Sequence, residues 1–311
     1  PIGILAFLGS AAFLPRSQRR PRRFDLAGFG MLALAIGTLQ LMLDRGGEVD
    51  WFASAEIWIY AVLAISGFWL FGTHIGTARQ PFLDPKIFAD RNFTTALFFI
   101  FVIGILLLSS LALLPPMLSR IFGYPVVTTG LVMAPRGVGT MISMLLVGRL
   151  VRVVDPRKLV VAGLLLTALS LWEMTGFSPQ MDSLPIIRSG ITQGLGLGLV
   201  FVPLSTVAFA TLAPQFRADA TSLFSLVRNI GSSIGISVVS YLLTRNIQVN
   251  HSELAAAINP FNPVLRQLSP AAVGGDASAL SSLDGLVNAQ AAMIAYVDDF
   301  WLMMWITLAA I

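Results

Sequence analysis

Residues 148–158 read Gly-Arg-Leu-Val-Arg-Val-Val-Asp-Pro-Arg-Lys and separate two long apolar runs, 128–147 and 159–177. Each run has about the 20 residues that a helix needs to cross the core of a bilayer. The Asp155-Pro156 pair stops a helix, because proline lacks a backbone donor and restricts the residue before it. The stretch therefore predicts a short charged hairpin between two membrane-spanning helices.

The composition of the whole chain favours a membrane protein. Of the 311 residues, 56% are hydrophobic and 12% are charged, and the mean hydropathy is +0.80. Soluble domains usually carry about 25% charged residues, and a soluble chain this apolar would expose large sticky patches. These values argue against a soluble globular domain. The absence of cysteine excludes disulfides, thiolate metal sites and a cysteine nucleophile.

Apolar runs recur along the chain at membrane-spanning length. The chain opens without methionine inside one such run, 1–14, and stops inside another, 300–311, so we interpret it as an internal fragment of a larger membrane protein. Between these two cut runs we expect seven complete spans. They are Leu26–Leu43, Ile57–Phe71 (extending past His74), Phe93–Leu114, Thr128–Val147, Leu159–Phe177, Leu184–Leu212 and Leu223–Leu243.

The distribution of basic residues orients these spans. If the spans alternate, one set of loops holds thirteen Lys and Arg residues and the other holds four. Cytoplasmic loops carry the excess of basic residues, so the first set is predicted to face the cytoplasm. The predicted cytoplasmic loops are 15–25, 72–92, 148–158 and 213–222, and the predicted outer loops are 44–56, 115–127, 178–183 and 244–299. Within the last of these, short surface helices are expected at 252–258 and 283–297.

Two arginines lie deep inside predicted spans. Arg136 and Arg228 are each at least the sixth residue from the nearer end of their run. A charge there costs at least about 2.5–3.5 kcal/mol unless it faces protein or water. Each arginine therefore either braces the bundle by bonding to carbonyls or lines a substrate or proton pathway. Arg188 and Glu173 lie near the outer ends of their spans, where we expect a snorkelling arginine and a solvated acid.

Two glycine patterns predict close helix packing. Gly190, Gly194 and Gly198 repeat every four residues and share one helix face, where small side chains let a second helix approach. Gly231 and Gly235 form a second such face. The sequence 231–235 also fits the G-x-S-x-G pattern of hydrolases, but that motif requires a strand, a turn and then a helix. It lies here inside a predicted helix, so we interpret it as a packing face.

The sequence offers no catalytic or metal-binding constellation. It contains no H-E-x-x-H motif, no P-loop and no His/Asp/Glu cluster of metal-ligand spacing. We therefore predict that the chain is not an enzyme and has no metal site and no cofactor. The basic residues gather in loops between spans, which suits membrane orientation better than nucleic-acid binding.

The charged hairpin resembles the second-half copy of the loop motif of the major facilitator superfamily. The sequence 43–46 (Leu-Asp-Arg-Gly) with 50–52 (Asp-Trp-Phe) resembles, more narrowly, the EmrB/QacA group of drug:proton antiporters with fourteen spans. Further agreement lies at Gln193-Gly194, Pro203-Leu204, 222–228, 231–235 and 259–263. The chain departs from the loop motif at Arg152, where the family usually has an acid. The resemblance implies an all-α transmembrane helix bundle with the major facilitator fold.

By the same resemblance, the fragment would run from the end of span six to the start of span fourteen. Residues 1–14 would end a preceding span and 15–25 would form a cytoplasmic basic loop. Residues 26–77 would be two extra linker spans. Residues 78–311 would be a truncated C-terminal six-helix bundle with the outer loop 244–299.

The resemblance also implies a function, which is the proton-coupled export of amphipathic drugs across the inner membrane. The expected partners are a lipophilic substrate, protons and the bilayer. If a periplasmic adaptor and an outer-membrane channel take part, as in relatives from Gram-negative cells, 244–299 is the expected docking surface. Alternatives are the export of a siderophore, lipid precursor or metabolite on the same fold, and a membrane scaffold without transport. The candidate transport and coupling residues are Arg228, Arg136 and Gln193. The candidate gating-loop residues are Gly148, Arg149, Asp155, Arg157 and Lys158, with Asp155 expected to pair with a neighbouring arginine.

Overall fold

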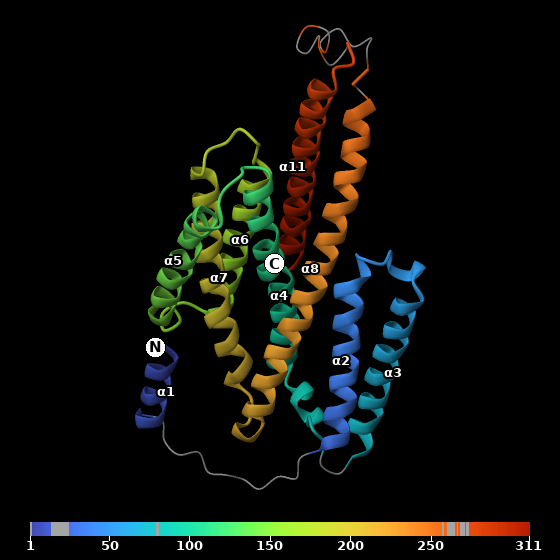
Figure 1. The fold of residues 1–311 in the computed structure, drawn as a ribbon. Coiled ribbons are helices and arrows are strands. Elements are labelled where there is room, and N and C mark those ends of the chain that lie inside the picture. Colours follow the sequence, from blue (N-terminus) through green and yellow to red (C-terminus); the bar gives the residue numbers. More distant parts are fainter. Residues whose placement is uncertain are drawn as a thin grey trace.

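The computed structural model describes residues 2–13, 25–78, 81–256, 258–259, 265, 267, 271 and 274–311, and this part of the chain is helical (Figure 1). The long helices are α1 (Ile2–Phe13), α2 (Leu26–Gly46), α3 (Ala55–Thr77), α4 (Arg91–Arg120), α5 (Val126–Leu150), α6 (Pro156–Thr175), α7 (Leu184–Ala210), α8 (Arg217–Ala256) and α11 (Ala277–Ala309). Among the described residues, eight of these helices are long and apolar enough to cross a membrane. The predicted all-α transmembrane bundle is thereby confirmed.

The largest difference from prediction lies at the C-terminal end of the chain. The apolar run 300–311 was expected to be too short to span a membrane, but residues 300–309 belong to the 33-residue helix α11, which is long and apolar enough to do so. Residues 283–297 are part of the same helix and are not a separate surface helix. Asp276 starts α11, because its carboxylate accepts the backbone N–H of Ser278 at 2.9 Å. The sequence prediction failed here because the acids of this stretch were interpreted as loop residues.

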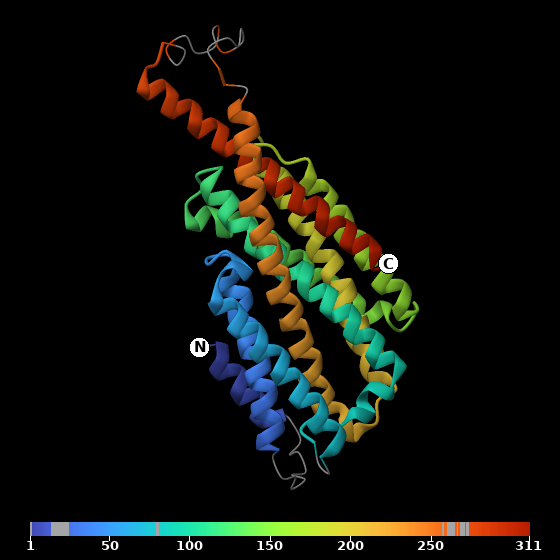
Figure 2. The same cartoon turned by 90° about the vertical axis from the view of Figure 1, so that its right-hand side faces the viewer.

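Helices α8 and α11 extend past the rest of the bundle at one end (Figures 1 and 2). The 40 residues of α8 correspond to roughly 60 Å of helix, about twice the core of a bilayer. The two extensions contact each other, since His251 Nε2 lies 3.0 Å from Asp284 Oδ1 and the Asn250 side chain donates to Ala291 O at 3.4 Å. The predicted loop 244–299 is therefore helical over 244–256 and 277–299, and part of its centre lies outside the described residues.

Glycines set the closest helix contacts of the bundle. A Cβ atom at Gly231 would overlap the carbonyl oxygen of Phe101 on α4, and one at Gly235 would lie 2.8 Å from Ile105 Cα. Gly104 of α4 approaches α8 in the same way, because a Cβ atom there would overlap the carbonyl oxygen of Arg228. The face carrying Gly231 and Gly235 thus packs on α4 with the two backbones in contact.

Helix α7 uses glycine on two faces. The face with Gly194 and Gly198 packs on α5: a Cβ atom at Gly194 would overlap the carbonyl oxygen of Arg136, and one at Gly198 would lie 2.6 Å from Ser143 Cβ. The opposite face packs on α6, where a Cβ atom at Gly196 would lie 2.7 Å from the carbonyl oxygen of Gly163. Helix α7 is therefore held between α5 and α6.

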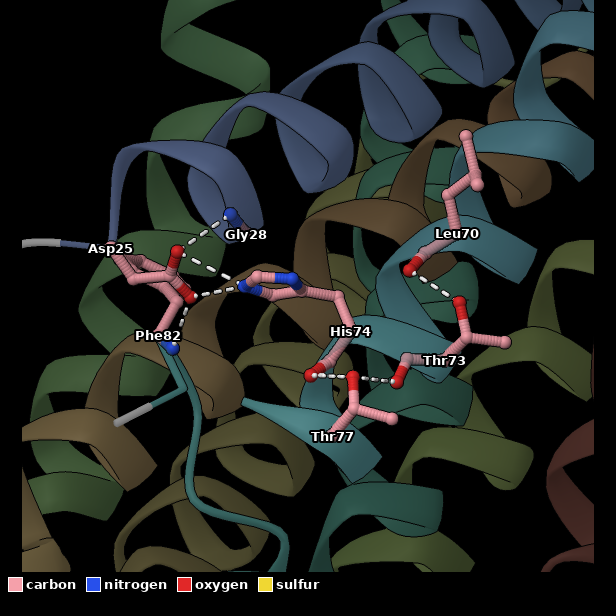
Figure 3. A network of polar contacts seen from close by, with 7 residues as sticks. All are labelled: Asp25, Gly28, Leu70, Thr73, His74, Thr77 and Phe82. Carbon is pink, nitrogen blue, oxygen red and sulfur yellow. Dashed lines mark hydrogen bonds and ion pairs between the residues drawn. The ribbon is translucent and has the colours of Figure 1, made fainter. Parts of the chain in front are cut away.

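Asp25 ties the helix pair α2–α3 to the segment that leads into α4 (Figure 3). Its carboxylate caps α2 by accepting the backbone N–H of Gly28 at 2.9 Å, and it accepts the backbone N–H of Phe82 at 3.0 Å. Nε2 of His74, on the last turns of α3, lies 2.9 Å from Asp25 Oδ2. One side chain thus joins the start of α2 to the end of α3 and to the segment before α4.

The stabilisation that this network gives to the fold depends on pH. The Gly28 N–H, with smaller contributions from His74 and Phe82, holds the pKa of Asp25 below its usual range, although burial acts in the opposite direction. A carboxyl with a lower pKa in the folded than in the unfolded chain stabilises the fold above its unfolded pKa of about 4. That stabilisation is lost as the pH falls through the lower, folded pKa.

We predict opposite effects of alanine at two glycines of α2. A Cβ atom at Gly28 would overlap the Asp25 carboxylate and lie 3.1 Å from His74 Cδ2, whereas one at Gly30 would meet nothing within 4 Å. Gly28→Ala should therefore lower the melting temperature in detergent. Gly30→Ala should leave it unchanged or raise it, because alanine is the better helix former by about 1 kcal/mol. Equal shifts in the two variants would show that the Asp25 network does not stabilise the fold.

Candidate substrate site

Three helices each contribute one buried polar side chain to a single cluster. The members of this polar cluster are Ser110 of α4, Arg136 of α5 and Gln193 of α7, and none is more than 8% exposed. Nη2 of Arg136 donates to Ser110 Oγ at 3.2 Å and to Leu107 O at 3.4 Å. The amide Nε2 of Gln193 donates to the same Ser110 Oγ at 3.3 Å.

Ser110 is the centre of the polar cluster. Its hydroxyl donates to Leu107 O at 3.1 Å while accepting from Arg136 and Gln193. A hydroxyl group has one proton and two lone pairs, so all of its hydrogen-bonding capacity is used. The adjacent Ser109 is also fully buried, but its hydroxyl has no partner among the described residues. Both residues are buried serines, so it is the position of Ser110 on α4 that places its hydroxyl between Arg136 and Gln193.

The polar cluster keeps one donor and one acceptor without a partner. Nη1 of Arg136 and Oε1 of Gln193 are buried, and neither has a hydrogen-bond partner in the described part of the chain. Buried polar groups are nearly always paired, since an unpaired one costs about 1–3 kcal/mol. The two atoms are thus available to a ligand or to a group contributed by another part of the protein.

A large apolar cavity lies beside the polar cluster. Its volume is about 940 Å³, within the range of sites for drug-sized ligands. Three methionines lie in its wall, and their flexible thioether side chains adapt to ligands of different shape. The lining residues are Leu107, Leu108, Leu111, Gly130, Met133, Ala134, Arg136, Gly137, Thr140, Met141, Met144, Leu145, Leu197 and Phe201. Arg136 is the one charged side chain in this lining.

Arg228 approaches the same cavity from α8. It is half-buried, and its guanidinium carbon lies 5.9 Å from the centre of the Phe201 ring, which lines the cavity. This is the geometry of a cation–π contact. The hydroxyl of Ser232 donates to the backbone carbonyls of Arg228 and Gly104, at 2.9 and 3.1 Å, so the α4 contact fixes the backbone here. Arg228 is not part of the polar cluster.

The hairpin 148–158 joins the last turn of α5 to the first turn of α6, away from Arg136, which lies near the middle of α5. Gly148 and Arg149 are in the last turn of α5, and Arg157 and Lys158 are in the first turn of α6. The carboxylate of Asp155 caps α6 by accepting the backbone N–H of Arg157 at 2.9 Å. Among the described residues no ion pair within 4.0 Å involves Asp155, so its pairing with a neighbouring arginine stays a prediction.

Glu173 and Arg188 form an ion pair between α6 and α7. Nε of Arg188 lies 3.1 Å from Glu173 Oε1, and the arginine side chain is 76% exposed, whereas the glutamate is only 14% exposed. The prediction that Glu173 is a solvated acid was therefore wrong. The glutamate is covered because its end of α6 packs in the bundle, and the long arginine reaches it from outside.

The place of Ser110 at the centre of the polar cluster was missed in the sequence. It follows Ser109 in a long apolar run, and nothing in the run distinguishes one serine from the other. Which of two neighbouring residues faces α5 and α7 depends on the rotation of α4, which apolar spacing alone does not define. A buried arginine in the next span was the available signal that a hydroxyl partner was needed.

The sequence of this chain is similar to those of known membrane transporters. The sequence pattern of the Major Facilitator Superfamily matches residues 1–236. "Multidrug export protein EmrB" of Escherichia coli (strain K12) is 34% identical over 266 residues, which cover 85% of this chain and 52% of the relative. "Fatty acid resistance protein FarB" of Neisseria gonorrhoeae is 34% identical over 279 residues, covering 86% of this chain and 53% of the relative.

A third relative, "Multidrug export protein EmrB" of Haemophilus influenzae, is 30% identical over 309 residues, covering 97% of this chain and 60% of the relative. The chain thus spans about half the length of the curated relatives it matches.

Proposed function

Because the chain belongs to the major facilitator superfamily of membrane transporters, as its loop motif predicts, we propose that it is part of a secondary active transporter that exports amphipathic drugs in exchange for protons. The observation that carries the proposal is the apolar cavity of about 940 Å³ with Arg136 in its wall. Its size, its methionines and its single charge suit a lipophilic compound with one polar group.

Substrate would lie between α4, α5 and α7, the helices whose residues line the cavity. Its apolar part would contact the methionines and Phe201, and its polar part would reach Arg136 and Gln193. Arginine stays protonated at physiological pH, so Arg136 cannot itself bind and release the proton that enters in exchange for the drug. It would act as a fixed charge that binds either substrate or an ionised carboxylate, and Arg228 would serve proton coupling in the same way.

The proposal includes an orientation in the membrane. Loops 15–25, 72–92, 148–158 and 213–222 would face the cytoplasm, because they hold most of the basic residues. The hairpin 148–158 would then close the cytoplasmic side as the two halves of the transporter rock around the site. The projecting ends of α8 and α11 would lie outside the inner membrane, where they offer the largest surface for an adaptor.

A second candidate function is the export of amphipathic anions, such as siderophores, lipid precursors or acidic metabolites. The unpartnered Nη1 of Arg136 favours it, because a guanidinium in an apolar wall binds a carboxylate or phosphate strongly. The name of the relative FarB, a fatty acid resistance protein, points in the same direction. The two candidates differ in the charge of the substrate and share the cavity.

The test is transport by the full-length protein in inverted vesicles with an imposed pH gradient. We expect a fluorescent lipophilic cation to accumulate when the vesicle interior is acidic, and accumulation to stop when a protonophore collapses the gradient. If a fluorescent fatty acid accumulates and the cation does not, the second candidate is correct. Accumulation of neither compound would identify a membrane scaffold and contradict both proposals.

A further inference from the structure

A buried acid lies in the last helix of the chain, outside the substrate site. Asp299 of α11 is 1% exposed, whereas its neighbour Asp298 is exposed. Oδ2 of Asp299 is buried without a hydrogen-bond partner. No hydrogen bond or ion pair of the described residues involves this side chain. By contrast, Asp155 and Asp276 cap helices, and Glu56 and Glu173 pair with arginines.

The surroundings of Asp299 are apolar. Tyr296, Phe300 and Met303, which flank it on α11, belong to the apolar cluster that joins α4, α6 and α11. The ring of Phe300 packs edge-on against Phe177, with 6.0 Å between their centres. An ionised carboxylate without a partner is strongly disfavoured among such side chains, as it is inside a membrane.

The charged groups on the packed helices do not pair with Asp299. On α4 the charged residue at this end is Arg120, in the last turn of the helix. On α6 it is Glu173, which binds Arg188. On α8, Arg245 lines a hollow shared with α2, and His251 contacts Asp284 of α11. The remaining neighbour is Asp298, whose like charge adds to the cost of ionising Asp299.

We propose that Asp299 is a proton-binding site within this part of the transporter. A proton taken from water forms an O–H bond at the buried carboxylate and neutralises it, and release of the proton returns the charge. Tyr296, about one turn closer to the start of α11, is buried as well.

This inference rests on the proposed function and deepens it, since it names a group that would bind the exchanged proton. Proton binding does not itself require export, so the two proposals can fail separately. The test is therefore made on the purified full-length protein without a gradient. The probe is dicyclohexylcarbodiimide, which adds to protonated carboxyl groups in apolar sites, and the modified residue is located by mass spectrometry.

We expect Asp299 to be modified, with a yield that falls at least tenfold as the pH is raised. The exposed Asp298 should stay unmodified. Asp299→Asn should abolish labelling of the α11 peptide, and the matched variant Asp298→Asn should retain it. Absence of labelling at Asp299, equal labelling of the two acids, or a yield independent of pH would overturn the proposal. In vesicles, Asp299→Asn should lose gradient-driven export while still binding substrate, and Asp298→Asn should keep both.

Discussion

Gly194→Val is expected to reduce the yield of folded full-length transporter more than tenfold. A Cβ atom at Gly194 would overlap the carbonyl oxygen of Arg136 and lie 2.9 Å from the backbone nitrogen of Thr140. Both contacts are with the backbone of α5, which cannot move aside as a flexible side chain does. Overpacking of this kind destabilises the folded state by about 1–3 kcal/mol or more. A loss of about 1.4 kcal/mol already lowers the ratio of folded to unfolded protein tenfold.

The matched control is Gly130→Val, a substitution on α5 where a Cβ atom would meet nothing within 4 Å. It introduces the same β-branched side chain into a membrane helix but leaves the α5–α7 contact intact. Size-exclusion profiles and melting temperatures in detergent, compared at equal expression, measure the effect. If both variants gave the same yield of folded protein, the close approach of α5 and α7 would not be essential to the fold.

The helices of the bundle core were largely predictable from the sequence. The Asp155-Pro156 pair marks the boundary between two apolar runs. In the structure it starts α6, with Asp155 as the cap and Pro156 as the first residue, whereas α5 already ends at Leu150. The four-residue spacing of Gly190, Gly194 and Gly198 likewise predicts a face for close packing. It does not say which helix occupies that face, because spacing describes one helix and not its neighbours. The structure places α5 there.

The projecting ends of α8 and α11 were not predictable from apolar runs. Outside the bilayer a helix needs no long apolar run, and here contacts such as His251 with Asp284 join the two helices. The acids at 298 and 299 were assigned to the loop because charge usually marks a span's end. Asp299 is nevertheless buried, since one side of α11 faces α4 and α6 at that level.

The polar cluster also needed the structure. Ser110, Arg136 and Gln193 lie on three helices, and their contact depends on how each helix is rotated. The sequence singled out Arg136 because a charge deep in a span is costly, and left open whether it braces the bundle or lines a pathway. The structure gives it both kinds of contact, with one nitrogen bonded to α4 and the side chain in the wall of the cavity.

Arg136→Ala is expected to lower gradient-driven export at least tenfold while the protein still inserts. The substitution removes the one charged side chain lining the cavity and takes a donor from Ser110. Arg136→Lys should be intermediate, because lysine keeps the charge but lacks the planar fork that bonds in fixed directions. Arg91→Ala is the matched control, since it removes the same side chain from an exposed position at the start of α4.

The most direct test of the role of the cavity is therefore the initial rate of export in inverted vesicles, normalised to inserted protein, for these three variants and the wild type. We predict wild-type export for Arg91→Ala, an intermediate rate for Arg136→Lys and a loss of at least tenfold for Arg136→Ala. Export by Arg136→Ala at the wild-type rate would contradict the account and would leave Arg136 as a brace between α4 and α5.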